Sequence, residues 1–439
     1  MNRRLFTVFD VKQRHNRAFS FLLAIVGLCM SASAQNTKFV TFDAPGAVYG
    51  TYVSSINDRG DVTGYYVDGN GVVHGLFRSS EGVVTDFSAP HASRNGYGTF
   101  GIAVNLEREV VGYYTNSKFN YGGFVRMPDG TFETYRYPNA CTSGDPEGCE
   151  GTGFAAINAF GIIAGGYIDK TFVQHALLRT PDGKVITYDA PGAGKTPGSP
   201  ANISPLGDYL YQGTNLAGIS PGLNLWGAVT SAYLDENNVY HGYLRTPEGN
   251  FTDFDAPDAG KGLAQGTVPI SLNDLGVITG FYLDSNNVYH AFLGEPDALT
   301  DFDAPDADTT DAYYGTQPAS VNDFGAITGY YLDASSVWHG FLRGPDGRFM
   351  KLDAPGADLT PGNFNGTFPS QINLFGVIAG FYIDAKSVAH GFLRIPCTTD
   401  CQNDEQAVPG VHKLPTNFGR KLIPFRRQRF SVMTSAHPE

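Results

Sequence analysis

Residues 316–353 read TQPASVNDFGAITGYYLDASSVWHGFLRGPDGRFMKLD, and this stretch decides the fold. It contains four runs rich in aromatic and β-branched residues, at 316–321, 326–332, 337–343 and 348–353. The runs are separated by Asn-Asp-Phe-Gly, Asp-Ala-Ser-Ser and Pro-Asp-Gly. Runs of this length between Gly, Pro, Asn and Asp are typical of strands joined by tight turns. The stretch therefore predicts four short antiparallel strands.

The same pattern recurs along the 439-residue chain. Each copy begins with Gly-Thr and reaches an Asn that opens an Asn-x-x-Gly turn, because both residues tolerate turn geometry. The fourth copy, from Gly213, has four extra residues, and the second has Arg108 in place of the turn glycine. The turn residues are Asn57, Asn105, Asn158, Asn224, Asn273, Asn322 and Asn373. Their intervals of 48, 53, 66, 49, 49 and 51 residues predict an all-β fold, a seven-bladed β-propeller of four-stranded antiparallel blades.

The two ends of the repeat array are complementary. The fourth run ends in Asp-Ala-Pro or a relative after each of the first six copies, whereas the seventh copy breaks off after Arg394. A matching run, KFVTFDAP, stands at residues 38–45, before the first complete copy. Pairing the chain ends would remove the exposed edges of an open array. The permutation therefore predicts a ring closed by the N-terminal strand completing the last blade.

The third run of most copies carries a histidine before Gly or Ala. These residues are His74, His175, His241, His290, His339 and His390, with Gly122 at this position in the second copy. With this motif the sequence resembles the bacterial extracellular repeat family named for its His-Ala-Phe motif. The resemblance covers residues 38–396, although only the fifth copy spells the motif literally. It implies export and repetition, and it brings no established activity.

An aspartate lies six residues before each of these histidines: Asp68, Asp169, Asp235, Asp284, Asp333 and Asp384. Equivalent residues on different blades do not converge on one centre, so we expect both sets to satisfy hydrogen bonds inside their blades. No catalytic, cofactor-binding or metal-ligating residue is predicted, and the nucleophile-elbow and P-loop motifs are missing. Calcium stays open as an alternative because the Asp68, Asp235 and Asp284 turns carry alternating oxygen donors, but calcium needs six to eight oxygens.

The acidic charge is concentrated in the repeat array. Residues 1–34 hold five basic and one acidic residue and residues 402–439 hold six and three, which leaves 19 and 39 in residues 35–401, a net charge of −20. Such a body repels phosphate backbones, so we expect no nucleic-acid binding. The loops after the fourth runs are expected to form an acidic binding rim for a cationic protein, a glycan or a divalent ion; alternatively, this charge only maintains solubility. The rim candidates are Asp258, Asp306, Asp308, Asp311 and Asp358.

The N-terminal residues 1–34 have the pattern of a secretory signal peptide: basic residues, an apolar run at 18–28, and Ala-Ser-Ala before Gln35. Arg3-Arg4 leaves a twin-arginine signal as an alternative, and Cys29 leaves lipidation. No later run approaches the length of a membrane span. We therefore expect a secreted or periplasmic bacterial protein, a monomer without a transmembrane segment.

Four cysteines flank or interrupt the array. In an exported protein the local pairs Cys141–Cys149 and Cys397–Cys401 are the expected disulfides, whereas a four-cysteine zinc site would require two distant loops to meet. Residues 35–401 are assigned to the propeller and residues 402–439 to a basic tail. Such a tail is expected to be disordered or, alternatively, to contact an anionic surface or partner.

These features favour an exported, non-enzymatic binding or structural module. The alternative is a propeller hydrolase or lyase acting on a polysaccharide, peptide or lactone-like substrate. That activity would require an asymmetric cluster of acid, base and stabilising groups.

Overall fold

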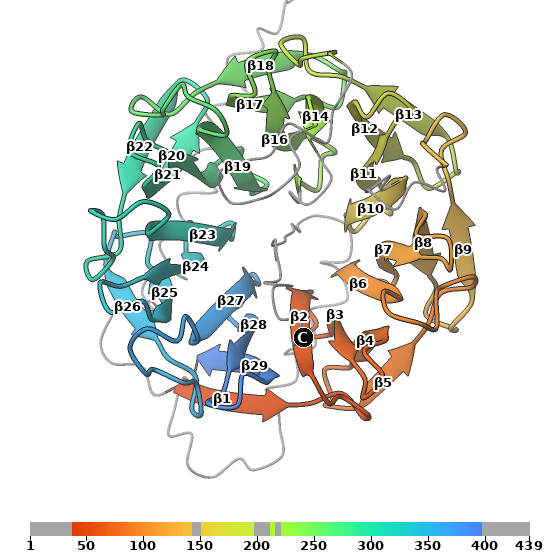
Figure 1. Ribbon diagram of the computed structural model, residues 1–439, viewed down its shortest axis with the longest axis horizontal. Coiled ribbons are helices and arrows are strands. Elements are labelled where there is room, and N and C mark those ends of the chain that lie inside the picture. Colours follow the sequence, from red (N-terminus) through yellow and green to blue (C-terminus); the bar gives the residue numbers. More distant parts are fainter. Residues whose placement is uncertain (1–36, 143–150, 197–210, 216–220, 397–439) are drawn as a thin grey trace, which may run out of the picture.

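The computed structural model describes residues 37–142, 151–196, 211–215 and 221–396, which form strands and turns without a helix. The all-β prediction is therefore confirmed for this part of the chain, and within it no helix is long and apolar enough to cross a membrane. Figure 1 shows the strands arranged in groups around a central axis. The expected signal peptide, the basic tail, Cys149, Cys397 and Cys401 lie outside the described residues, so the disulfide pairing stays a prediction.

Each group, called a unit here, is an antiparallel meander whose first strand lies nearest the axis and whose last strand lies outside (Figure 1). The first three units are β2 (Gly50–Ile56), β3 (Val62–Val67), β4 (Val73–Arg78) and β5 (Val84–Phe87); β6 (Thr99–Val104), β7 (Val110–Thr115), β8 (Tyr121–Arg126) and β9 (Phe132–Tyr135); and β10 (Thr152–Ile157), β11 (Ile163–Ile168), β12 (Gln174–Arg179) and β13 (Val185–Tyr188).

The next three units are β14 (Gly213–Asn215), β15 (Gly222–Leu223), β16 (Val229–Leu234), β17 (Tyr240–Arg245) and β18 (Phe251–Phe254); β19 (Gly266–Leu272), β20 (Ile278–Leu283), β21 (Tyr289–Glu295) and β22 (Ala298–Phe302); and β23 (Gly315–Val321), β24 (Ile327–Leu332), β25 (Trp338–Arg343) and β26 (Phe349–Leu352). The last unit comprises β27 (Thr367–Ile372), β28 (Ile378–Ile383), β29 (Ala389–Pro396) and β1 (Thr37–Phe42). In the unit from β23 to β26, each observed strand end lies within one residue of the prediction.

The Gly-Thr phrase joins each unit to the one before it. Gly315 pairs with Tyr289 of the preceding unit, and a Cβ at Gly315 would lie only 1.9 Å from the Tyr289 carbonyl oxygen. With φ at +117°, this position suits glycine alone. The adjacent Thr316 hydroxyl accepts the backbone N–H of Ala304 in Asp-Ala-Pro at 2.9 Å. The two most regular motifs of the sequence therefore bond to each other across the junction between units.

The first strand of the chain lies on the outer edge of the last unit, as Figure 1 shows. β1 pairs antiparallel with β29 from Thr37 opposite Pro396 to Phe42 opposite Gly391. Phe39 packs on Phe392, with ring centroids 5.7 Å apart. The pairing expected from the complementary chain ends is thus present.

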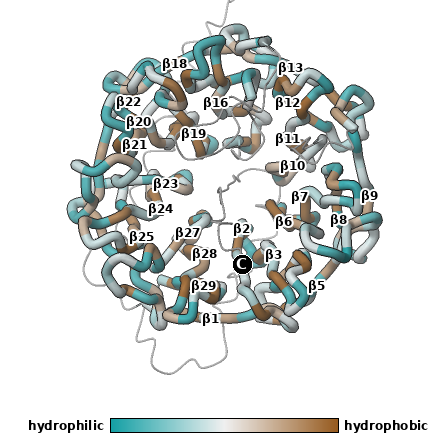
Figure 2. The backbone as a smooth tube through the Cα atoms, in the orientation of Figure 1, coloured by the Kyte–Doolittle hydropathy of each residue, from teal (hydrophilic) through white to brown (hydrophobic). Residues whose placement is uncertain are grey.

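The hydrophobic core lies between consecutive units rather than at the axis. One cluster joins Leu352 of β26 to Ile372, Ile378 and Phe392 of the last unit, all of them buried. Figure 2 shows hydrophobic stretches along the strands and hydrophilic stretches in the connecting turns. Because consecutive units pack against each other, the polar turns at the strand ends are left on the two sides of the arrangement seen in Figure 1.

Candidate functional site

One face of the ring carries the loops that the sequence predicted to lie together. In the loop after Pro305, the Tyr313 N–H donates to the Asn287 carbonyl of the same unit at 2.7 Å. The Asp308 N–H of this loop donates to the Leu332 carbonyl of the next unit, at 3.0 Å. These bonds hold the loops beside the hairpins between the second and third strands. We call this surface the rim face.

Four histidines of the third strands, His175, His241, His339 and His390, lie between two carboxylates on this face. His339 is buried, with its Nδ1 2.7 Å from an Asp353 oxygen and its Nε2 3.3 Å from an Asp333 oxygen. Its ring also lies against Tyr331, with centroids 5.3 Å apart. The aspartate six residues before the histidine is within 4 Å of Nε2 in five units, through Asp68, Asp169, Asp235, Asp333 and Asp384. In those five units the two side chains meet inside the second hairpin, and their structural role stays a prediction.

The closer partner of most histidines is an aspartate that the sequence analysis did not assign. It is the first residue of Asp-Ala-Pro on the fourth strand, which approaches Nδ1: Asp189, Asp255, Asp303, Asp353 and, for His390, Asp43. In the first unit Ser88 takes this place, 3.1 Å from His74 Nδ1. This contact could have been predicted from the sequence, because the Asp of Asp-Ala-Pro follows the third-strand histidine at a regular spacing of 13 or 14 residues.

Neighbouring carboxylates raise the pKa of His241 and His290. The hydrogen bond from Asp255 raises the pKa of His241 above its ordinary value against the opposing effect of burial. The hydrogen bond from Asp303 does the same for the pKa of His290. When both ring nitrogens donate to carboxylates, the imidazolium form is favoured. These sets are suited to holding a proton and fastening the outer strand.

The second unit departs from this arrangement for a steric reason. A Cβ at Gly122 would lie 2.6 Å from the ring of Tyr114, so this tyrosine occupies the space that a larger side chain would need. In other units the corresponding tyrosine lies against the histidine, as Tyr66 does against His74 at 5.0 Å. The missing histidine of the motif is therefore replaced by closer aromatic packing.

The predicted rim aspartates differ in accessibility. Asp258, Asp306 and Asp311 are exposed, and Asp308 is half-buried with its carboxylate accepting from the Thr310 N–H and hydroxyl. Asp358 is buried, and its oxygens accept from the Thr360 N–H and from both Asn363 and Asn365 side chains. Those hydrogen bonds hold the pKa of Asp358 well below its usual range. The Asp358 carboxylate organises its own loop, whereas Asp258, Asp306 and Asp311 are exposed to solvent.

The hairpin aspartates that left calcium open form Asx turns. Asp284 Oδ1 accepts the N–H groups of Asn286 and Val288, both at 2.8 Å. Within the described ranges, no three His, Cys, Asp or Glu side chains are grouped so that they could hold a metal ion. Calcium binding is not tested by this observation.

The opposite face carries a set of bonds that the sequence analysis did not anticipate. The turn asparagine of each unit donates from Nδ2 to the backbone carbonyl of the turn asparagine in the next unit. We call this surface the asparagine face. The bonds run Asn57→Asn105, Asn105→Asn158, Asn158→Asn224, Asn224→Asn273, Asn273→Asn322, Asn322→Asn373 and Asn373→Asn57, at 2.8 to 3.5 Å. The chain of donors returns to its start, so every unit is fastened to both neighbours.

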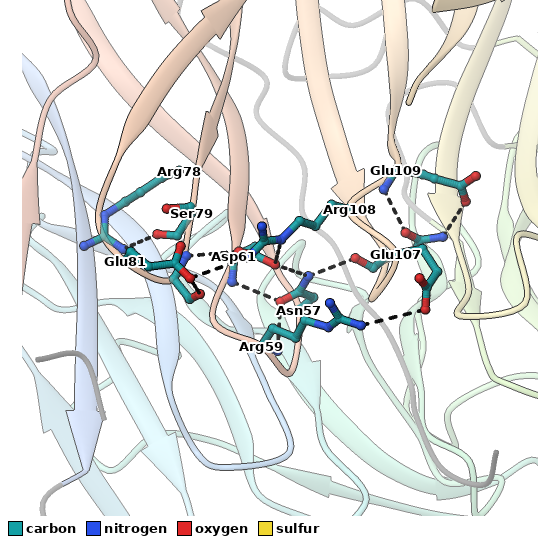
Figure 3. Close-up of polar contacts among 11 residues, drawn as sticks. Asn57, Arg59, Asp61, Arg78, Ser79, Glu81, Glu107, Arg108 and Glu109 are labelled. Atoms are coloured by element: carbon teal, nitrogen blue, oxygen red, sulfur yellow. Dashed lines mark hydrogen bonds and ion pairs between the residues drawn. The ribbon is translucent and has the colours of Figure 1, made fainter. Parts of the chain in front are cut away.

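The turn without glycine is stabilised by charge. Arg108 adopts φ +65° where the other turns have glycine, and its Nε lies 3.1 Å from Oδ2 of the buried Asp61 in the first unit. Asn57 donates to the same oxygen at 3.1 Å, as Figure 3 shows. The substitution that looked like a defect in the repeat thus supplies an ion pair between two units.

No family model and no curated protein matches the chain. Among solved structures it is similar to the fungal Aleuria aurantia lectin, described as a six-bladed β-propeller, at 12% identity over 81% of this chain and 99% of that one, with a TM-score of 0.37. The BP39L lectin from Burkholderia pseudomallei matches at 12% identity over 83% and 99%, TM-score 0.40. A putative gluconolactonase matches at 12% over 83% and 94%, TM-score 0.36. Similarity at this level does not identify a function for the chain.

Proposed function

We propose that this chain is an exported bacterial protein of the His-Ala-Phe repeat type, a seven-bladed β-propeller closed by its N-terminal strand. It serves as a non-enzymatic binding module at the cell exterior. The asparagine bonds that return to their start and the pairing of β1 with β29 support the closed ring. A rigid ring of this kind presents loops, and the function resides in those loops.

The observation that carries the binding assignment is the acidic rim face. Asp258, Asp306, Asp308 and Asp311 lie on loops that are hydrogen-bonded to the neighbouring hairpins and are thereby held in place. Fixed carboxylates attract cationic groups over distances of about 10 Å at 0.1 M salt. We infer that the partner is a cationic protein or peptide, or a glycan presented with a divalent ion.

The distribution of titratable groups argues against the hydrolase or lyase alternative. Histidine–carboxylate sets recur in six units, each bonded to the strands around it, rather than as one asymmetric cluster. An acid–base enzyme needs a nonequivalent pair of groups that face one substrate. The repeated sets instead fasten the scaffold that carries the rim.

A screen of mature protein from Gln35 against glycans, cationic peptides and calcium tests this assignment. If a ligand is found, the triple variant Asp306→Asn, Asp308→Asn, Asp311→Asn should weaken its affinity about tenfold at low salt, because three charges are removed from one face. The matched control Asp129→Asn, Asp182→Asn, Asp346→Asn removes three exposed carboxylates from hairpins at the opposite strand ends and should leave affinity unchanged.

Two results would contradict the proposal. Equal affinity of both triple variants, with no salt dependence, would show that the rim charge only solvates the surface. Catalytic turnover of a polysaccharide, peptide or lactone by the wild type would establish the enzyme instead.

A further inference from the structure

The asparagine face carries large apolar side chains at one repeated position. The second residue after the turn asparagine is apolar in five consecutive units, and four of these side chains are about half exposed: Phe160 at 53%, Trp226 at 55%, Leu275 at 49% and Phe375 at 48%. Phe324 is the fifth member and is less exposed. We call these five residues the apolar crown. The other two units place Arg59 and Glu107 at this position, and those side chains pair with each other at 3.8 Å.

The crown residues stand on the turns of five consecutive units. Their turns are joined by the asparagine bonds, and Trp226 Nε1 donates to the Asp274 carbonyl of the next turn at 3.1 Å. A single exposed apolar residue needs no explanation, but a large apolar side chain repeated on five consecutive turns of one face indicates a contact surface. We therefore expect the crown to bind a segment that has apolar side chains.

Acidic side chains accompany the crown. Asp58 and Asp323 directly follow turn asparagines, and each accepts a backbone N–H of a neighbouring turn, from Leu374 at 2.8 Å and from Asp274 at 2.9 Å. Asp58 Oδ2 is buried and has no hydrogen-bond partner among the described residues. Burial raises the pKa of Asp58 to about 7, so ionisation at this position is opposed unless a cation approaches. The cover should thus be basic as well as apolar.

The chain itself leaves the last unit on this face. β29 starts after the 384–388 hairpin on the rim face and runs to Pro396, passing Arg394 opposite Ile378, just beyond the Asn373 turn. Forty-three residues follow Pro396 in the sequence. The 21 residues between Pro396 and Phe418 can span up to about 70 Å at roughly 3.3 Å per residue.

The composition of that tail matches the crown. Residues 418–430 read FGRKLIPFRRQRF, with five large apolar residues, five basic residues and no acidic one. A segment tethered to the same molecule has an effective concentration in the millimolar range, which favours it over a separate partner of similar chemistry. The basic charge and apolar content of residues 418–430 thus complement the crown, and β29 ends on the same face.

We propose that residues 418–430 of this chain dock on the apolar crown, with Phe418, Phe425 and Phe430 covering its aromatic side chains and the arginines lying near Asp58 and Asp323. The contact is intramolecular and covers the asparagine face. It leaves the rim face as the one open to a partner.

Trp226 provides the test, because the chain has only two tryptophans. In full-length protein with Trp338→Phe, acrylamide quenching reports Trp226 alone. Replacing Phe418, Phe425 and Phe430 by Ser should uncover Trp226 and raise its quenching constant at least about twofold, since a tethered contact is occupied most of the time. The matched control replaces Val408, Val411 and Leu414 of the same tail by Ser and should leave quenching unchanged.

Should Trp338→Phe fail to fold, the Trp226 signal is obtained as the difference between each protein and its Trp226→Phe variant. Equal quenching of the two tail variants would overturn the proposal. Protection of Trp226 that increases with protein concentration and persists in the tail variant would overturn it in favour of a second copy on the crown.

Discussion

The two faces of the ring use repeated polar residues in different ways. On the asparagine face each side-chain amide bonds to the neighbouring unit, 48 to 67 residues away along most of the chain. On the rim face the histidine sets stay within one unit, at separations of 6 and 14 residues. The exception is His390, whose partner Asp43 is 347 residues away because β1 completes the last unit. A residue that recurs once in each repeat, such as the Asn or the His, can therefore bond either to the next unit or within its own unit.

The largest expected effect comes from removing the strand that completes the last unit. Deleting residues 38–45 removes β1, the Asp43 partner of His390 and the Phe39 contact with Phe392. The exposed edge of β29 should promote aggregation, and the lost burial should lower the free energy of unfolding by about 5 kcal/mol. Thermal melting and size-exclusion chromatography measure both. A deletion variant that stays monomeric and melts like the wild type would refute closure by the N-terminal strand.

The next effect compares a buried turn asparagine with an exposed hairpin asparagine. Asn273→Ala removes a donor to the Asn322 carbonyl and an acceptor for the Leu275 and Val277 N–H groups, all at a buried position. We expect a loss of about 3 kcal/mol in chemical unfolding. The control Asn286→Ala removes an exposed amide that donates only to Asp284 within its own hairpin, and should cost less than about 0.5 kcal/mol. Equal losses would show that the asparagine cycle adds no stability.

A smaller loss is expected on the rim face. His339→Ala leaves Asp333 and Asp353 without their shared partner, yet both carboxylates retain access to water. The free energy of unfolding should fall by about 1–2 kcal/mol, while any partner affinity of the folded fraction is retained. Loss of affinity at an unchanged melting temperature would assign this histidine to binding instead.

The smallest effect is the pH dependence of the histidine sets. The folded-state pKa values of His241 and His290 are raised by Asp255 and Asp303, so the folded protein binds protons more tightly than the unfolded chain. Their contribution is complete below the ordinary histidine pKa of about 6.5 and is lost as pH rises through the raised values. Replacing both by Gln should flatten this part of the stability profile measured by urea unfolding. An unchanged slope would mean that these sets do not bind their proton preferentially in the folded state.

Much of the local structure could be predicted from the sequence. The four strands of 316–353 were located to within one residue, because strand length and turn chemistry depend on neighbouring residues. The pairing of β1 with β29 followed from counting fourth strands. The site was predicted less completely: the hairpin aspartates near the histidines were identified, whereas the closer Asp-Ala-Pro aspartates were not.

By itself the sequence determined the all-β class, the period near 50 residues and the turn at each asparagine, since these arise from alternation and turn preference over a few residues. Only the tertiary structure decided that Asn273 reaches Asn322, that Arg108 lies against Asp61 and that Asp358 is buried by its own loop. Side-chain patterns specify which face of a strand is buried. Bonds between units also depend on how neighbouring sheets are placed, and that placement results from packing around the whole ring.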